Sequence, residues 1–119
     1  MSVDRLSKKA LQKILSGKIK EDATCVVKFY SNGCHLCHNL KDKYEEIATQ
    51  YNDIHFFAFN IQDYPTAEKV LGFDGVPSIS LIRTGGLRPR IRVLRDPEKP
   101  YENMWFNPKD IIEFIEKEK

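Results

Sequence analysis

Two short apolar runs, separated by a stripe of helical periodicity, constrain the fold of this chain more than any other feature. Residues 24–30 (TCVVKFY) are β-branched and aromatic, and residues 54–61 (IHFFAFNI) are almost continuously apolar. Both patterns are typical of buried strands. Between them, apolar residues recur every three or four positions over residues 34–50, which predicts a helix. Strands joined through a helix pair in parallel, so an α/β sheet covered by helices is expected.

The segments on either side extend this pattern. An apolar stripe at helical spacing predicts an amphipathic helix over residues 1–20, ahead of a core fold over residues 21–119. A short helix is expected over residues 63–71, closed by Gly72. Further on, strands over residues 78–83 and 88–94 would form an antiparallel hairpin.

The chain ends in one more predicted helix, which begins at Asn107-Pro108, a favourable cap and first position. The expected order is therefore α-β-α-β-α-β-β-α. We expect a central mixed sheet with helices on both faces, in a single domain of 119 residues.

Composition narrows the possible function classes. With 41% hydrophobic and 30% charged residues, the chain has an ordinary globular mixture. A net charge of +2 gives no strong field for nucleic acid, and no apolar run approaches the roughly twenty residues of a membrane span. The N-terminus lacks the continuous apolar run of a secretory signal, so a cytoplasmic monomer that binds neither nucleic acid nor membrane is expected.

Cys34 and Cys37 carry the clearest chemistry in the sequence. The chain has three cysteines, and such an odd, low number argues against a secreted disulfide scaffold. The pair lies where a turn leads from a strand into a helix, and its spacing puts both sulfurs on one side of the first helical turn. The helix N-terminus stabilises a thiolate and lowers the pKa of a cysteine there. Cys34 is therefore predicted to attack a disulfide of another protein, and Cys37 to resolve the mixed disulfide.

Other interpretations of these cysteines remain open at this point. The segment Cys34 to His38 matches C-x-x-C-H, the attachment pattern of c-type haem. Zinc could use both cysteines with His35 or His38, although the only further candidates are Cys25 and His55. The spacing could also be accidental. The favoured hypothesis is a redox pair with no metal and no cofactor other than its own disulfide.

Val76-Pro77 supplies a second marker, about forty residues after the cysteines and directly before a predicted strand. Together with Val26 to Tyr30, Asn60-Ile61, Pro65 and the closing hairpin and helix, these residues make the chain resemble the thioredoxin family over roughly residues 20–119. The resemblance implies a thioredoxin fold and thiol–disulfide exchange without a cofactor. It also implies that Pro77 is a cis proline and that the backbone of Val76 pairs with an extended substrate.

The chain departs from the usual family pattern beside the nucleophile. Thioredoxins usually carry Trp-Cys-Gly-Pro-Cys, whereas this sequence has Gly33-Cys34-His35-Leu36-Cys37. A histidine next to the nucleophile should favour the thiolate. The disulfide would then be easier to reduce than that of a typical thioredoxin.

A second departure lies on the central strand. Lys28 occupies the position where the family usually has a buried acid that helps to deprotonate the resolving cysteine. Because an unpaired buried charge is costly, Lys28 is predicted to extend to solvent or to pair with a carboxylate. The alternative is a desolvated lysine with a lowered pKa, which would tune the thiols directly.

Two further segments could bind a partner, but their residues favour a structural role. The loop over residues 96–107 carries Tyr101, Trp105 and Phe106, which are predicted to cover the edge of the core rather than a partner. Arg88, Arg90 and Arg92 alternate along a strand, as expected of a charged edge that resists aggregation.

The sequence thus supports a protein-disulfide oxidoreductase as the first hypothesis. Its partners would be disulfide-containing proteins and a reductase or other thiol donor. The second hypothesis is a binding module of the same fold, in which the Val76-Pro77 groove or the aromatic loop holds a partner and the cysteines are incidental.

Overall fold

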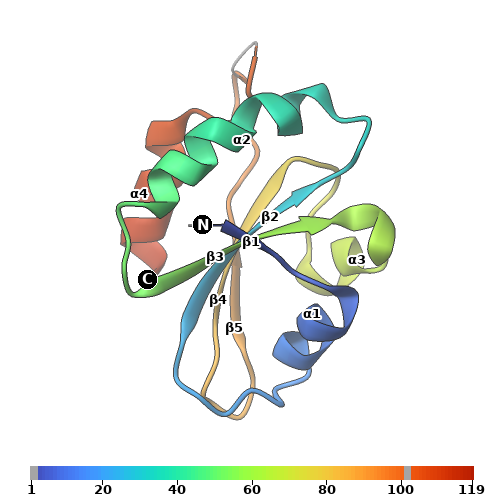
Figure 1. Cartoon of the computed structure of the whole chain (residues 1–119), viewed down its shortest axis with the longest axis vertical. Coiled ribbons are helices and arrows are strands. Elements are labelled where there is room, and N and C mark those ends of the chain that lie inside the picture. Colours follow the sequence, from blue (N-terminus) through green and yellow to red (C-terminus); the bar gives the residue numbers. More distant parts are fainter. Residues whose placement is uncertain (1–2, 101–102) are drawn as a thin grey trace.

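A five-stranded mixed sheet forms the centre of the computed structural model, which describes residues 3–100 and 103–119 (Figure 1). The sheet has the order β1-β3-β2-β4-β5. The strands are β1 (Val3–Arg5), β2 (Thr24–Tyr30), β3 (Ile54–Asn60), β4 (Ser78–Arg83) and β5 (Arg90–Val93). The first three are parallel to one another, while β4 runs antiparallel to both β2 and β5. The predicted mixed sheet with a C-terminal hairpin is confirmed.

Helices cover both faces of the sheet, as expected. The helices are α1 (Lys8–Leu15), α2 (His35–Ala48), α3 (Ala67–Leu71) and α4 (Pro108–Glu118), with a 3-10 turn, η1, at Ile61–Asp63. Figure 1 shows α2 and α4 together on one face and α1 and α3 on the other. The two predicted helix boundaries with specific capping residues are also observed. Gly72 adopts a left-handed conformation after α3, and the Asn107 side chain accepts a hydrogen bond from the Lys109 backbone N–H ahead of Pro108.

The predicted N-terminal helix over residues 1–20 is wrong in its first part. Val3–Arg5 form the edge strand β1, which pairs in parallel with Phe56 to Ala58 of β3. Helix α1 begins only after Ser7, whose side chain accepts a hydrogen bond from the Ala10 backbone N–H. Val3 and Leu6 fit a helical stripe, but a three-residue strand is too short to show alternation, and its pairing with β3 is non-local.

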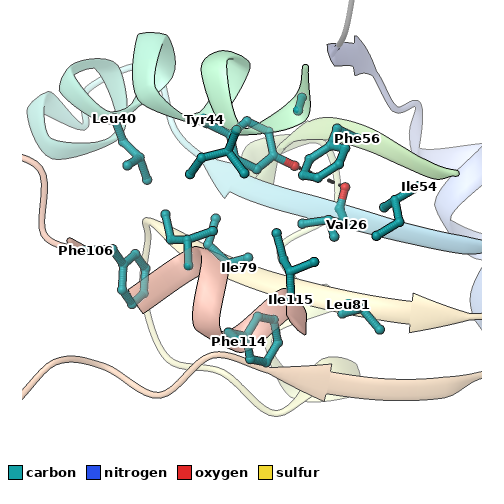
Figure 2. Close-up of a cluster of buried hydrophobic side chains, with 13 residues drawn as sticks. Val26, Leu40, Tyr44, Ile54, Phe56, Ile79, Leu81, Phe106, Phe114 and Ile115 are labelled. Carbon is teal, nitrogen blue, oxygen red and sulfur yellow. Dashed lines mark hydrogen bonds between the residues drawn. The ribbon is translucent and has the colours of Figure 1, made fainter. Parts of the chain in front are cut away.

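Alternation along β2 divides the interior into two cores. Val26 packs with residues of α2 and α4, including Leu40, Tyr44 and Ile115 (Figure 2). Val27 and Phe29 face the opposite side and pack with a second cluster from α1, α3 and β3. Because side chains alternate across a strand, Lys28 lies on the same face as Val26, beneath α2. This placement determines the environment of the cysteines.

The loop before α4 is part of the first core. Phe106 is buried and Trp105 is half-buried against the same cluster, which supports the predicted role in covering the core edge. Tyr101, the third aromatic residue of that prediction, lies outside the described residues. On the edge strand β5, Arg90 and Arg92 lie 3.0 and 3.7 Å from the carboxylate of Glu118 in α4. This edge of the sheet is thus charged and tied to the last helix.

Candidate functional site

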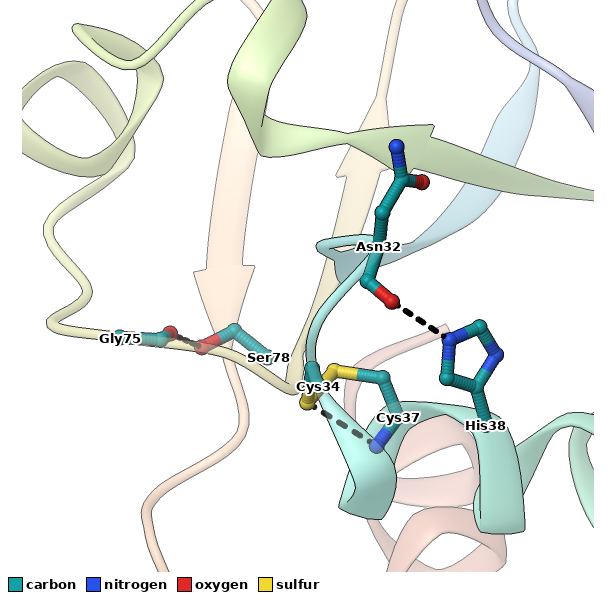
Figure 3. Close-up of a disulfide and its surroundings, with 6 residues drawn as sticks. All are labelled: Asn32, Cys34, Cys37, His38, Gly75 and Ser78. Atoms are coloured by element: carbon teal, nitrogen blue, oxygen red, sulfur yellow. Dashed lines mark hydrogen bonds between the residues drawn. A yellow bond between two sulfur atoms is a disulfide. The ribbon is translucent and has the colours of Figure 1, made fainter.

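Cys34 and Cys37 form a disulfide at the start of α2 (Figure 3). Their Cα atoms are 5.2 Å apart, within the range that a disulfide spans. Cys34 is the N-cap residue of the helix, as the turn at residues 31–33 predicted, and it keeps an extended backbone. The chain therefore turns directly from the buried strand β2 into a helix whose first residues carry the two sulfurs.

The two sulfur atoms differ in environment in the way that the redox hypothesis requires. Cys34 is half-buried, whereas Cys37 is only 2% exposed. The backbone N–H of Cys37 donates a hydrogen bond to the Cys34 Sγ atom over 3.0 Å. An N–H group at a helix N-terminus carries part of the positive end of the helix dipole, so this contact stabilises negative charge on the Cys34 sulfur. The accessible sulfur is thus the candidate nucleophile.

The segment before β4 lies in the surroundings of the disulfide (Figure 3). Ser78 pairs with Phe29 at the end of β2, which brings the start of β4 to the same edge of the sheet as the cysteines. The Val76–Pro77 peptide bond is cis. The Ser78 hydroxyl donates to the carbonyl of Gly75 over 2.7 Å and closes the turn around this bond. Pro77 is buried and Val76 is half-buried.

A polar network that the sequence did not predict holds the turn before Cys34. The Asn60 side-chain amide donates to the Asn32 side-chain oxygen over 3.1 Å, and the His38 Nε2–H donates to the Asn32 carbonyl over 3.0 Å. These contacts join the turn to β3 and to α2. Asn32 has the residue type of a turn, but its partners are distant in sequence. His35, by contrast, is exposed next to Cys34.

Lys28 neither extends to solvent nor pairs with a carboxylate, so the predicted placement is wrong. Lys28 is 4% exposed, and no carboxylate oxygen of the described residues lies within 4 Å of its ammonium. The Nζ atom lies 5.2 Å from the ring centre of Tyr44 and 5.9 Å from that of Tyr30. Aromatic faces attract a cation and offset part of the cost of burial.

Lys28 and Cys37 both line one cavity of about 310 Å³ beneath α2. Burial lowers the pKa of Lys28 from 10.5 to about 8, partly offset by the nearby carboxylate of Glu45. Exposed side chains such as Lys41 and Arg5 complete the lining, so the cavity opens toward solvent. A buried lysine therefore shares a cavity with Cys37, the more buried cysteine of the pair.

From the lowered pKa of Lys28 we predict how the free energy of unfolding depends on pH. Because the unfolded chain holds the Lys28 proton up to about pH 10.5 and the folded chain only up to about pH 8, the folded state gains relative stability as pH rises between these values. We expect the free energy of unfolding of the wild type, relative to Lys28→Met, to increase by about 2 kcal/mol from pH 7 to pH 10. Urea unfolding of the two oxidised proteins measures this difference, and a flat difference across the range would contradict the buried ammonium.

Cys25 and His55 were the further candidate metal ligands in the sequence. Cys25 is buried, and burial raises the pKa of its thiol to about 12, as expected of an inert core residue. His55 is exposed and stacks on Phe57. Over residues 3–100 and 103–119, no group of three or more His, Cys, Asp or Glu side chains is arranged to hold a metal ion.

Within the same residues, the helices are all too short or too polar to span a bilayer.

Comparison with solved structures shows a shared fold at low sequence identity. Thioredoxin f2, in its complex with ferredoxin:thioredoxin reductase, superposes with a TM-score of 0.70 and 22% identity, covering 97% of this chain and 93% of that one. The oxidised form of mitochondrial thioredoxin 3 from Saccharomyces cerevisiae gives 0.66 and 17%, covering 98% and 95%. The J-Trx1 fragment of ERdj5 gives 0.67 and 19%; this chain is covered to 98% but spans about half of that fragment, 49%.

Sequence comparisons give two results. No match was found among curated proteins. The family model described as Thioredoxin matches residues 2–99, which includes β1 and α1 as well as the cysteine pair. The resemblance inferred from residue 20 onward thus begins earlier in the chain, because the N-terminal strand belongs to the same sheet. With this match, the fold and a Cys34–Cys37 pair joined at the start of α2, the chain belongs to the thioredoxin family.

Proposed function

We propose that this protein is a thiol–disulfide oxidoreductase that exchanges disulfides with other proteins through Cys34 and Cys37. The observation that carries the proposal is the asymmetry of the pair: Cys34 is accessible and receives a backbone N–H, while Cys37 is buried one helical turn away. In the reducing direction, the Cys34 thiolate attacks a substrate disulfide and releases one substrate thiolate. The Cys37 thiolate then attacks the Cys34 sulfur and releases the second substrate thiolate. This step leaves the Cys34–Cys37 disulfide.

The segment around Val76 and Pro77 would hold the substrate. Gly75 and Val76 precede β4 at the edge of the sheet that carries the cysteines. A backbone segment outside a ladder offers its N–H and carbonyl groups to an extended peptide. We propose that Val76 pairs with the substrate backbone in this way, with Pro77 shaping the turn.

Turnover of insulin disulfides by dithiothreitol tests the proposed activity. The wild type is expected to accelerate insulin reduction, and Cys34→Ser is expected to leave only the uncatalysed rate. Both proteins should have the same unfolding midpoint when reduced, which controls for misfolding. Equal rates for wild type and Cys34→Ser would instead favour a binding module of this fold with incidental cysteines.

The redox couple is expected to be less reducing than that of a typical thioredoxin. A histidine beside the nucleophile stabilises the thiolate whenever its ring is protonated, and a more stable thiolate favours the reduced form. The expected reduction potential lies above the value of about −270 mV typical of thioredoxin. Equilibration with glutathione buffers measures it, with His35→Ala expected to shift the potential downward. A value at or below that of thioredoxin would reject this role for His35.

The partners in this scheme are disulfide-containing proteins and a reductase or other thiol donor. The solved complex of thioredoxin f2 with ferredoxin:thioredoxin reductase involves a protein of the same fold. We further propose that the protein works as a monomer in the cytoplasm, where thiols are kept reduced, with its own disulfide in place of a bound cofactor.

A further inference from the structure

The cavity beneath α2 is lined both by Lys28, which is buried, and by Cys37. Lys28 projects from β2 onto the face of the sheet that α2 covers, between Ala58 of β3 and Ile79 of β4 in register. Cys37 projects inward from the first turn of α2, and Lys41, Tyr44 and Glu45 follow it on the same helical stripe. Lys28 and Cys37 thus line the same cavity from the two layers that enclose it.

Around this cavity, no carboxylate of the described residues lies within 4 Å of the Lys28 ammonium. The titratable groups that line it with Lys28 and Cys37 are Asp4 and Arg5 from β1, Tyr30 from β2, and His38, Lys41, Tyr44 and Glu45 from α2. Arg5 and Lys41 offset the two carboxylates in formal charge, and the hydroxyl of Tyr44 donates to the carbonyls of Phe57 and Val26. One buried positive charge remains uncompensated, and such a charge is costly.

In the oxidised protein the neighbouring sulfur is neutral, because it belongs to the disulfide. When the disulfide is reduced, Cys37 becomes an ionisable thiol, and loss of its proton would supply the missing negative charge. We infer that the Cys37 thiolate is the counter-ion of Lys28, so that this lysine promotes ionisation of the resolving cysteine. The inference rests on the proposed function and specifies how that same site is regulated.

After Cys34 has formed a mixed disulfide with the substrate, the Cys37 thiol loses its proton to solvent through the cavity, and the Lys28 ammonium stabilises the thiolate. The Cys37 thiolate then attacks the Cys34 sulfur, the bond between Cys34 and the substrate sulfur breaks, and the substrate leaves as a thiolate. Lys28 contacts no reacting substrate atom in this scheme and acts only through Cys37.

The direct test measures ionisation of Cys37 in a Cys34→Ser background, where it is the only motif thiol. Titration of ¹³Cβ-labelled cysteine by NMR follows it, and the thiol of Cys25 does not interfere because its pKa is raised to about 12. Replacing Lys28 with methionine is expected to lower the acid dissociation constant of Cys37 about tenfold. The matched control is Lys41→Met, which removes an exposed cation from the same cavity and should change it much less. An unchanged constant in a folded Lys28→Met protein, or equal effects of the two substitutions, would overturn the inference.

A second measurement needs no substitution at Lys28. Coupling between two titrating groups is reciprocal, so the Lys28 ammonium must hold its proton more tightly in the reduced protein than in the oxidised one. Titration of the Lys28 side-chain ¹⁵N signal in both redox states of the wild type is expected to show this shift. Identical titration curves in the two states would refute the pairing even if Lys28→Met does not fold.

These outcomes are independent of the activity assay. A wild type that reduces insulin but shows no coupling between Lys28 and Cys37 would retain the proposed function and remove this inference. A wild type that shows the coupling but does not accelerate insulin reduction would retain the pairing of Lys28 with Cys37 and remove the proposed function. In an active protein, at a pH where Cys37 is ionised in both proteins, the tenfold change at Cys37 is also expected as a tenfold shift in the equilibrium with glutathione, about 30 mV toward a more reducing couple in Lys28→Met.

Discussion

Cys37→Ser is expected to trap a mixed disulfide with substrate, and Cys34→Ser to trap none. Without a resolving thiol, the complex between Cys34 and the substrate cannot be released internally, so it accumulates. Without Cys34, the remaining thiol is only 2% exposed and cannot reach a protein disulfide. Turnover of insulin disulfides should fall in both variants, in Cys34→Ser on the order of a hundredfold or more, because a serine hydroxyl is not ionised at neutral pH.

Non-reducing gel electrophoresis after incubation with oxidised insulin measures the trapped complex. Cys25→Ala is the matched control, because Cys25 is a buried free cysteine outside the Cys34–Cys37 pair, and it should behave as the wild type does. If Cys34→Ser accumulated the complex and Cys37→Ser did not, the roles assigned to the two cysteines would be reversed.

Phe106→Ala is expected to destabilise the fold by about 3–5 kcal/mol, as is typical when a buried phenylalanine is removed from a core. Phe106 is 1% exposed and packs in the core formed by α2, α4 and the sheet. Trp105→Ala should cost clearly less, because Trp105 is only half-buried and its indole N–H donates to Asp96 at the surface.

Urea unfolding followed by circular dichroism compares the two variants, since Trp105 is the only tryptophan and its loss removes the fluorescence probe. Both proteins should keep the insulin reductase activity of the wild type while folded. A Phe106→Ala protein of native stability that had lost affinity for its substrate would show that this loop is a partner surface instead.

The local part of the site was predictable from the sequence. The turn at residues 31–33 and the apolar stripe after it predicted a helix start at Cys34, and Cys34 is the N-cap residue of α2. The two-residue gap between the cysteines then determines how close their sulfurs lie, because both positions belong to one helical turn. The two apolar runs similarly predicted the buried strands β2 and β3.

The features that the sequence analysis predicted wrongly or missed depend on contacts between distant segments. β1 has only three residues, and its identity as a strand comes from pairing with β3 more than fifty positions away. The contact of Asn32 with Asn60 likewise joins the turn before Cys34 to another strand. Neither partner can be found from residue type or spacing nearby.

Lys28 shows most clearly the difference between what the sequence determines and what only the tertiary structure decides. The sequence by itself determined the fold class, the position of the cysteine pair and the helix that begins at Cys34, because these follow from short-range periodicity and capping. Only the tertiary structure decided that the ammonium of Lys28 is buried beneath α2, in a cavity that it shares with Cys37. The physical reason is that the energy of a charge depends on the dielectric and on the charges around it, and here these surroundings come from three separate elements.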